Sequence, residues 1–246
     1  MIRFTFYLAL LLAMFSTANS AHAQQPYEFV RIKGLSEQIV GERLLTEIYR
    51  RANIPMNITA MTGSRALEEA SSGRKDGETL RVFTLGDKFP SLLRVPTAIS
   101  DLTTQAFGIK KAGVHIETAD DLKKYALAIN RGVRHTLNIT QGLQNVHVLP
   151  SSNLFIPFLS RGRADLGLTG RLNGLSLIKV SGIKNVELIC KPLAVLPLYH
   201  YIHKDHEDLV PVISEVVKTM VGSGEMARLR AQFEQEYLDS IKTITQ

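Results

Sequence analysis

The chain has 246 residues, with 29 Lys and Arg against 23 Asp and Glu, and a formal net charge of +6. This mild surplus is interspersed along the chain, without the basic stripe and neighbouring aromatic residues typical of nucleic-acid-binding proteins, so we expect no nucleic-acid partner. The single cysteine, Cys190, excludes an internal disulfide, and we interpret it as a small buried hydrophobe in a strand.

The first 23 residues have the pattern of a cleavable secretory signal peptide. Arg3 supplies the positive start, residues 4–15 form an apolar run, and Ala21 and Ala23 fit the small-x-small cleavage pattern. The run is too short for a membrane-spanning helix, which needs ~20 residues. No cysteine lies near the cleavage site, so we expect no lipid anchor. The sequence therefore predicts a soluble periplasmic protein that begins at Gln24, with 223 residues (246 less 23) for one large domain or two lobes of about 100 residues.

The first half of the mature chain alternates predicted strands with predicted helices. Ser36 is a credible N-cap, and Val40, Leu44 and Ile48 recur at the spacing of a core-facing helical stripe. We expect strands at 27–32 and 56–61 with a helix between them, then a helix capped by Thr62 or Ser64 and ending at Gly73. A strand at 76–83 and a loop at 86–90 follow. Strands at 92–99 and 103–110 and a turn at 110–113 complete this half.

The second half contains a small parallel α/β unit at residues 118–190. Two of its predicted strand ends place Gly beside Arg at a helix N-terminus, in 131–134 and in 169–171, where open α/β sheets bind small and usually anionic ligands. We expect a helix start with a Thr118–Asp121 capping box and strands at 126–130, 146–149, 166–168 and 186–190. Helices are expected from 134, from 171 and at 152–161, where Pro157 lies in the first turns or kinks the helix. A strand at 193–202 and two closing helices separated by 222–224 end the chain.

Several short motifs, in this order and spacing, resemble those of the family 3 periplasmic solute-binding proteins. They are Gly63-Ser-Arg-Ala-Leu67, Gly73-Arg-Lys-Asp-Gly-Glu78, Thr118-Ala-Asp-Asp-Leu122, and Leu154-Phe155 followed by Gly162-Arg-Ala-Asp165. The resemblance covers essentially the whole mature chain.

The resemblance implies the two-lobed type II periplasmic-binding-protein fold, an α/β architecture in which each lobe is a mixed, mostly parallel sheet flanked by helices. Lobe 1 would comprise 27–100 plus 195–246 and lobe 2 would comprise 105–190, with two crossover hinge strands near 101–104 and 191–194. Such proteins close on a small-molecule solute in the interlobe cleft and deliver it to an inner-membrane permease, because only the closed form contacts the ligand from both sides. We expect a monomer that needs no cofactor.

The chain departs from the amino-acid binders of this family at the positions that hold the ligand. Those proteins bind the ammonium group with an Asp about five residues after the Gly-Arg-x-Asp motif, where this chain has Gly170. Their Gly-Ser/Thr loop is here Gly132-Val133-Arg134, and Arg81 is the nearest candidate for the Arg that binds the ligand carboxylate. We therefore expect an anionic or polar solute rather than an ordinary L-α-amino acid.

Five arginines at or near predicted strand ends are candidates for binding an anion, because a guanidinium fork binds carboxylate or phosphate with two parallel bonds. Arg134 is the strongest candidate, since it lies in the first turn of a helix. Arg81 is three residues from Glu78 and has an equal alternative as an internal ion pair; the others have the alternative of solvated surface residues. The candidate ligand-binding residues are Ser36, Arg65, Glu78, Arg81, Thr97, Arg131, Arg134, Thr169 and Arg171, with no catalytic residue and no metal ligand assigned.

Two other functions remain open on the sequence. One is an enzyme on the same scaffold, similar to the cyclohexadienyl dehydratases, with Glu78 as the plausible general acid or base. The other is a ligand-sensing partner of a membrane receptor in place of a permease. The leading prediction is a binding protein without chemistry.

Overall fold

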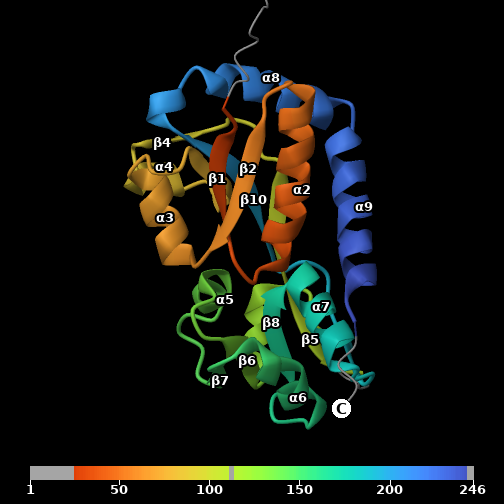
Figure 1. Ribbon diagram of the computed structural model, residues 1–246. Coiled ribbons are helices and arrows are strands. Elements are labelled where there is room, and N and C mark those ends of the chain that lie inside the picture. The colour runs from red at the N-terminus through yellow and green to blue at the C-terminus, as the bar shows by residue number, and fades with distance from the viewer. Residues whose placement is uncertain (1–24, 111–113, 243–246) are drawn as a thin grey trace, which may run out of the picture.

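The computed structural model describes residues 25–110 and 114–242, so the predicted signal peptide and the predicted turn after Lys110 lie outside the described residues. Figure 1 shows two lobes joined by two long strands, β5 (Ser100–Ile109) and β10 (Ala194–His203). The first lobe contains β1 (Tyr27–Ile32), α2 (Ser36–Arg51), β2 (Met56–Met61), α3 (Gly63–Ser71), β3 (Gly77–Val82), α4 (Leu85–Lys88), β4 (Leu92–Arg94), the 3-10 helix η3 (Lys204–His206), α8 (Leu209–Gly222) and α9 (Glu225–Ser240).

The second lobe is built from the middle of the chain. It contains the 3-10 helix η1 (Ala119–Lys124), β6 (Leu127–Asn130), α5 (Arg134–Ile139), β7 (Val146–Leu149), the 3-10 helix η2 (Ser152–Leu154), α6 (Phe155–Ser160), β8 (Leu166–Gly170), α7 (Arg171–Ser181) and β9 (Val186–Leu188). The alternation of strands and helices that the sequence predicts is therefore confirmed.

The strands form one continuous sheet across both lobes, in the order β2-β1-β3-β10-β5-β8-β6-β7. Strands joined by helical crossovers pair in parallel, as β1 does with β2 and β6 does with β7. At the centre, β10 and β5 pair antiparallel over five residues, from Ala194 opposite Thr104 to Leu198 opposite Ser100. This short pairing carries the chain from one lobe to the other and back.

Each lobe has its own hydrophobic core. The larger core of the first lobe buries the stripe of α2 against α8 and α9, and includes Phe29, Leu44 and Ile213. The second lobe packs Phe107 and Phe155 on one face of its sheet and Leu127 and Leu166 on the other. A residue of the second lobe, Leu172 at the start of α7, belongs to the core of the first and is 3% exposed.

Two local predictions about helix starts are confirmed. The Thr118–Asp121 capping box is present at η1, and Pro157 lies in the first turn of α6, where its missing N–H breaks no helical hydrogen bond.

Three local predictions were wrong. The N-cap of α2 is Leu35, so Ser36 is the first helical residue and not the cap. The predicted loop at 86–90 contains most of α4. The predicted strand at 92–99 ends at Arg94, because Pro96 has no backbone N–H to continue a ladder.

Gly174 allows α7 to approach the sheet closely, because a Cβ there would overlap the buried ring of Phe107. Gly174→Ala should therefore lower the free energy of unfolding by about 1–3 kcal/mol through overpacking. Urea unfolding followed by circular dichroism measures this change. Gly222→Ala is the matched control, since a Cβ at Gly222 has no atom within 4 Å, and it should leave stability unchanged or slightly raised. Equal stabilities for the two variants would contradict the packing argument.

Candidate functional site

The structure joins Glu78 and Arg81 in an internal ion pair. Both carboxylate oxygens of Glu78 accept hydrogen bonds from Arg81, at 2.6 and 2.8 Å, and Arg81 also donates to the carbonyl oxygen of Gly63 at 3.2 Å. Glu78 is fully buried, and this burial raises the pKa of its carboxyl while the Arg81 hydrogen bonds oppose the shift. The pair braces β3 against the start of α3.

Three other predicted residues are also held by internal contacts. The Ser36 hydroxyl lies 3.2 Å from that of Ser176 and 3.0 Å from that of Tyr237. Thr169 accepts a hydrogen bond from the side-chain amide of Asn173 at 3.0 Å, and Arg65 lies exposed on α3, 3.8 Å from Glu69. The two hydroxyl groups thus have partners inside the protein, whereas the Arg65 guanidinium faces solvent beside Glu69.

Arg131 and Arg134 lie exposed where β6 ends and α5 begins. Within residues 25–110 and 114–242, neither has an ion pair. The next residue, His135, anchors α5 to the crossing strand β5, because its Nδ1 lies 2.7 Å from the Thr104 hydroxyl. Burial lowers the pKa of His135 to about 4, so the imidazole is neutral at pH 7. Thr97 lies half-buried in the segment between β4 and β5.

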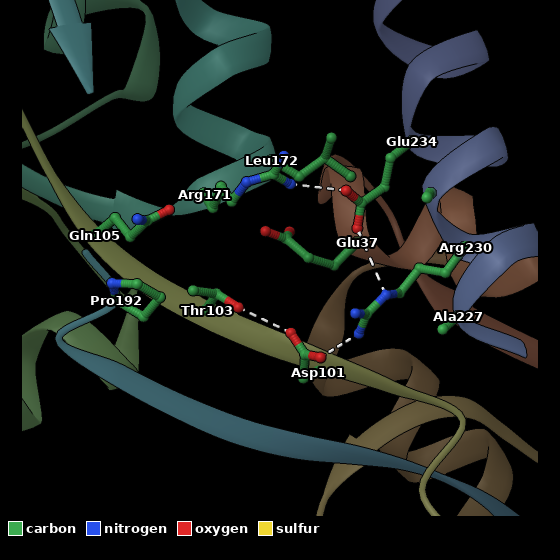
Figure 2. A pocket seen from close by; sticks show the side chains of 11 residues that line it. Glu37, Asp101, Thr103, Gln105, Arg171, Leu172, Pro192, Ala227, Arg230 and Glu234 are labelled. Atoms are coloured by element: carbon green, nitrogen blue, oxygen red, sulfur yellow. Dashed lines mark hydrogen bonds and ion pairs between the residues drawn. The ribbon is translucent and has the colours of Figure 1, made fainter. Parts of the chain in front are cut away.

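A hollow of about 400 Å³ lies beside the crossing strands, between α7 of the second lobe and α9 of the first. Figure 2 shows its lining, to which both lobes contribute. Of the nine predicted residues, Arg171 alone is among those that line it. The lining residues are Glu37, Asp101, Thr103, Gln105, Arg171, Leu172, Pro192, Ala227, Arg230, Ala231 and Glu234.

The charged side chains of this hollow are three carboxylates and two guanidinium groups. Arg171 donates to Glu234 at 2.7 Å, across the lobes, and Arg230 donates to Asp101. Thr103 donates its hydroxyl proton to Asp101 at 2.8 Å. Arg230 also lies 4.0 Å from Glu234, so Glu234 contacts both arginines, and among the described residues no cation forms an ion pair with Glu37 (Figure 2).

Within the part of the chain that the structure describes, two buried acceptor atoms of the lining have no hydrogen-bond partner: Oε1 of Glu37 and Oε1 of Gln105. The Gln105 side-chain NH₂ donates to the carbonyl oxygen of Cys190 at 2.8 Å, which turns Oε1 away from that contact. Burial raises the pKa of the Glu37 carboxyl; backbone N–H groups of Glu37 and Asn173 oppose this shift, and Glu234 adds to it. An unpaired buried acceptor costs about 1–3 kcal/mol, so these atoms favour an occupant that donates hydrogen bonds.

The Glu37 side chain lies against Gly170, the position at which the sequence has no carboxylate. A Cβ at Gly170 would overlap Glu37 Oε1, so the α2 carboxylate fills the space next to the residue at which the family resemblance predicts an amine-binding carboxylate. Two patterns in the sequence indicate parts of this lining. Asp101, Thr103 and Gln105 alternate along β5 on one face, and Arg230 and Glu234 are four residues apart on α9.

Over residues 25–110 and 114–242, no helix has the length and apolar character needed to cross a membrane. The same part of the chain contains no group of three or more His, Cys, Asp or Glu side chains arranged to hold a metal ion.

No known protein family and no curated protein matches the sequence, whereas many solved structures match the fold. The GluR0 ligand-binding core, solved with L-glutamate, superposes with a TM-score of 0.71 at 10% identity, over 86% of this chain and 99% of that one. The probable amino-acid ABC transporter extracellular-binding protein YtmK from Bacillus subtilis gives 0.69 at 15% identity, over 85% and 97%. A histidine kinase sensor domain with similarity to periplasmic binding proteins gives 0.66 at 14% identity, over 85% and 96%.

These likenesses establish the fold. The chain has the two-lobed type II periplasmic-binding-protein fold, consistent with the family 3 solute-binding proteins that the sequence motifs resemble. The predicted fold class is confirmed.

Glu37→Gln should stabilise the protein more at pH 8 than at pH 4.5. Because the folded-state pKa of Glu37 is raised, ionisation above that pKa favours the unfolded chain, while below the unfolded-state pKa both states are protonated and the difference vanishes. Urea unfolding of both proteins at several pH values in this range measures the effect.

Glu236→Gln provides the control with the opposite sign. The hydrogen bond from Arg43 holds the pKa of Glu236 below its usual range, so losing this carboxylate should cost stability at pH 8 and less at low pH. A pH-independent difference between Glu37→Gln and the original protein would contradict the burial argument.

Proposed function

We propose that this protein is an exported solute-binding protein that captures a small polar or anionic metabolite between its two lobes. The observation that carries the proposal is the hollow beside β5, lined from both lobes and containing buried polar atoms without partners. A ligand that contacts both lobes favours the conformation in which they are close, because other conformations lose half of those contacts.

The proposed lobes are 27–100 with 195–246 and 105–190, and the proposed hinges lie near 101–104 and 191–194, next to the pairing of β5 with β10. Five paired residues connect the lobes at this point, and the two cores lie on either side of it. Small changes in the backbone dihedrals of a few such residues are sufficient for hinge closure in proteins of two lobes.

Binding without chemistry agrees best with the side chains present. Glu78, the candidate general acid or base, is fully buried, and both of its oxygens are bonded to Arg81. Because this carboxylate is fully buried and paired with Arg81, a substrate in solution does not reach it, which disfavours a dehydratase-like enzyme.

The proposed partner is an inner-membrane component, a permease or a sensor receptor, that recognises the closed form in the periplasm. Solved structures of the same fold include a transporter's extracellular-binding protein and a histidine kinase sensor domain. Both kinds of partner therefore fit the proposal.

A thermal-shift screen of polar and anionic metabolites tests solute binding. A ligand at a hundred times its dissociation constant adds about 2.7 kcal/mol to the stability of the native state, which gives an easily measured rise in Tm. Small-angle scattering with the best ligand should show a smaller radius of gyration if the lobes close. A screen without any stabilising solute would contradict the proposed function.

Arg134 does not line the hollow, so Arg134→Ala tests whether the exposed arginines at the start of α5 contribute to solute binding in addition to it. If Arg134 contacts an anionic group of the solute, its loss should weaken calorimetric affinity about tenfold or more. Arg161→Ala is the matched control, because Arg161 is an exposed arginine just after α6. Unchanged affinity in Arg134→Ala would remove this residue from the site.

A further inference from the structure

We propose that the hollow beside β5 is an ammonium-binding site, in which Glu37, Gln105 and Thr103 accept hydrogen bonds from the protonated primary amine of a small solute. This inference rests on the proposed function, and it specifies which chemical group of the solute that function selects.

The charges of the lining leave room for one added cation. Glu37, Asp101 and Glu234 give three negative groups, and Arg171 and Arg230 give two positive ones. The arginines are engaged with Glu234 and Asp101, so Glu37 is the carboxylate without a counter-ion. A buried carboxylate is stable when a cation lies beside it, and a bound ammonium group would supply that cation.

The lining offers two unpaired acceptor atoms, and the Thr103 oxygen as a third acceptor, for the three donors of an ammonium group. Oε1 of Glu37 and Oε1 of Gln105 are buried acceptors without partners, and Gln105 is only 4% exposed. Thr103 donates its proton to Asp101, so its hydroxyl oxygen can act only as a further acceptor. An ammonium group has three donors and no acceptor, whereas a carboxylate has acceptors only.

The arrangement in Figure 2 places these groups around the same space. The side chains of Glu37, Thr103 and Gln105 come from the start of α2 and from one face of β5, and they point inward between α7 and α9. The orientation of Gln105 is fixed by its donation to the Cys190 carbonyl, so its amide oxygen is the atom that remains for a ligand. A volume of about 400 Å³ holds a small metabolite.

Three compounds with the same hydroxypentyl frame and different head groups test the inference. 5-Amino-1-pentanol carries the ammonium group, 1,5-pentanediol a neutral hydroxyl and 5-hydroxypentanoate a carboxylate. We expect the amine alone to raise the Tm at millimolar concentrations, and calorimetry to give its affinity.

Two variants link that binding to the hollow. Glu37→Gln keeps the shape and removes the charge, and it should weaken amine affinity about tenfold or more. Gln105→Met removes the amide acceptor and should also weaken it. Glu236→Gln, on the outer side of α9, should bind the amine as the original protein does.

The outcomes separate this inference from the proposed function. A Tm rise with 5-hydroxypentanoate and none with the amine would overturn the ammonium site and still support a solute-binding protein. Amine binding that is unchanged in both Glu37→Gln and Gln105→Met would place the amine elsewhere and overturn the site. If none of the three compounds binds, the ammonium site is overturned, and the wider metabolite screen decides on solute binding.

Discussion

The contact that organises this molecule is the insertion of the first turns of α7 between α2 and α9. Leu172 enters the core of the first lobe, Ser176 lies within hydrogen-bond distance of Ser36, and Arg171 pairs with Glu234. These contacts join the lobes without the help of a ligand, and they form one wall of the hollow in Figure 2. The relative position of the lobes is thus determined by side chains of the protein as well as by the pairing of β5 with β10.

Close approach on both sides of α7 requires residues without a Cβ, at the contact with α2 and at the sheet of the second lobe. Gly170 leaves space for the Glu37 carboxylate, and Gly174 leaves space for the ring of Phe107. The first of these places a negative charge from one lobe at the start of a helix in the other. The polar lining of the hollow follows from that arrangement, which buries Oε1 of Glu37 without a hydrogen-bond donor among the described residues.

The sequence predicted the elements of the fold well because hydrophobic periodicity and helix-start signals are local. The stripe of α2, the capping box at Thr118 and the place of Pro157 follow from residues within a few positions of each other. Two of the wrong predictions also concern single neighbouring residues. The N-cap of α2 is Leu35 and not Ser36, and β4 ends at Arg94, two residues before Pro96.

The lining of the hollow was much less predictable, because it depends on contacts between residues far apart in the chain. Glu37 and Gly170 are adjacent only in the folded protein, and the carboxylate that pairs with Arg171, Glu234, lies 63 positions away in the sequence. The pairing of Arg81 with Glu78 was one of two equal alternatives, since three residues separate them and either outcome satisfied the local pattern.

The strength of the ion pairs between α7 and α9 depends on the salt concentration, whereas that of the apolar contact made by Leu172 does not. Arg171–Glu234 and Lys179–Asp239 link α7 to α9, and their side chains are between 23% and 63% exposed, so mobile ions screen them. Burial of Leu172 is not weakened in this way. Media of low ionic strength therefore hold the two lobes together more firmly than salty ones, so the salt content of the surroundings becomes a variable that affects how readily this molecule opens.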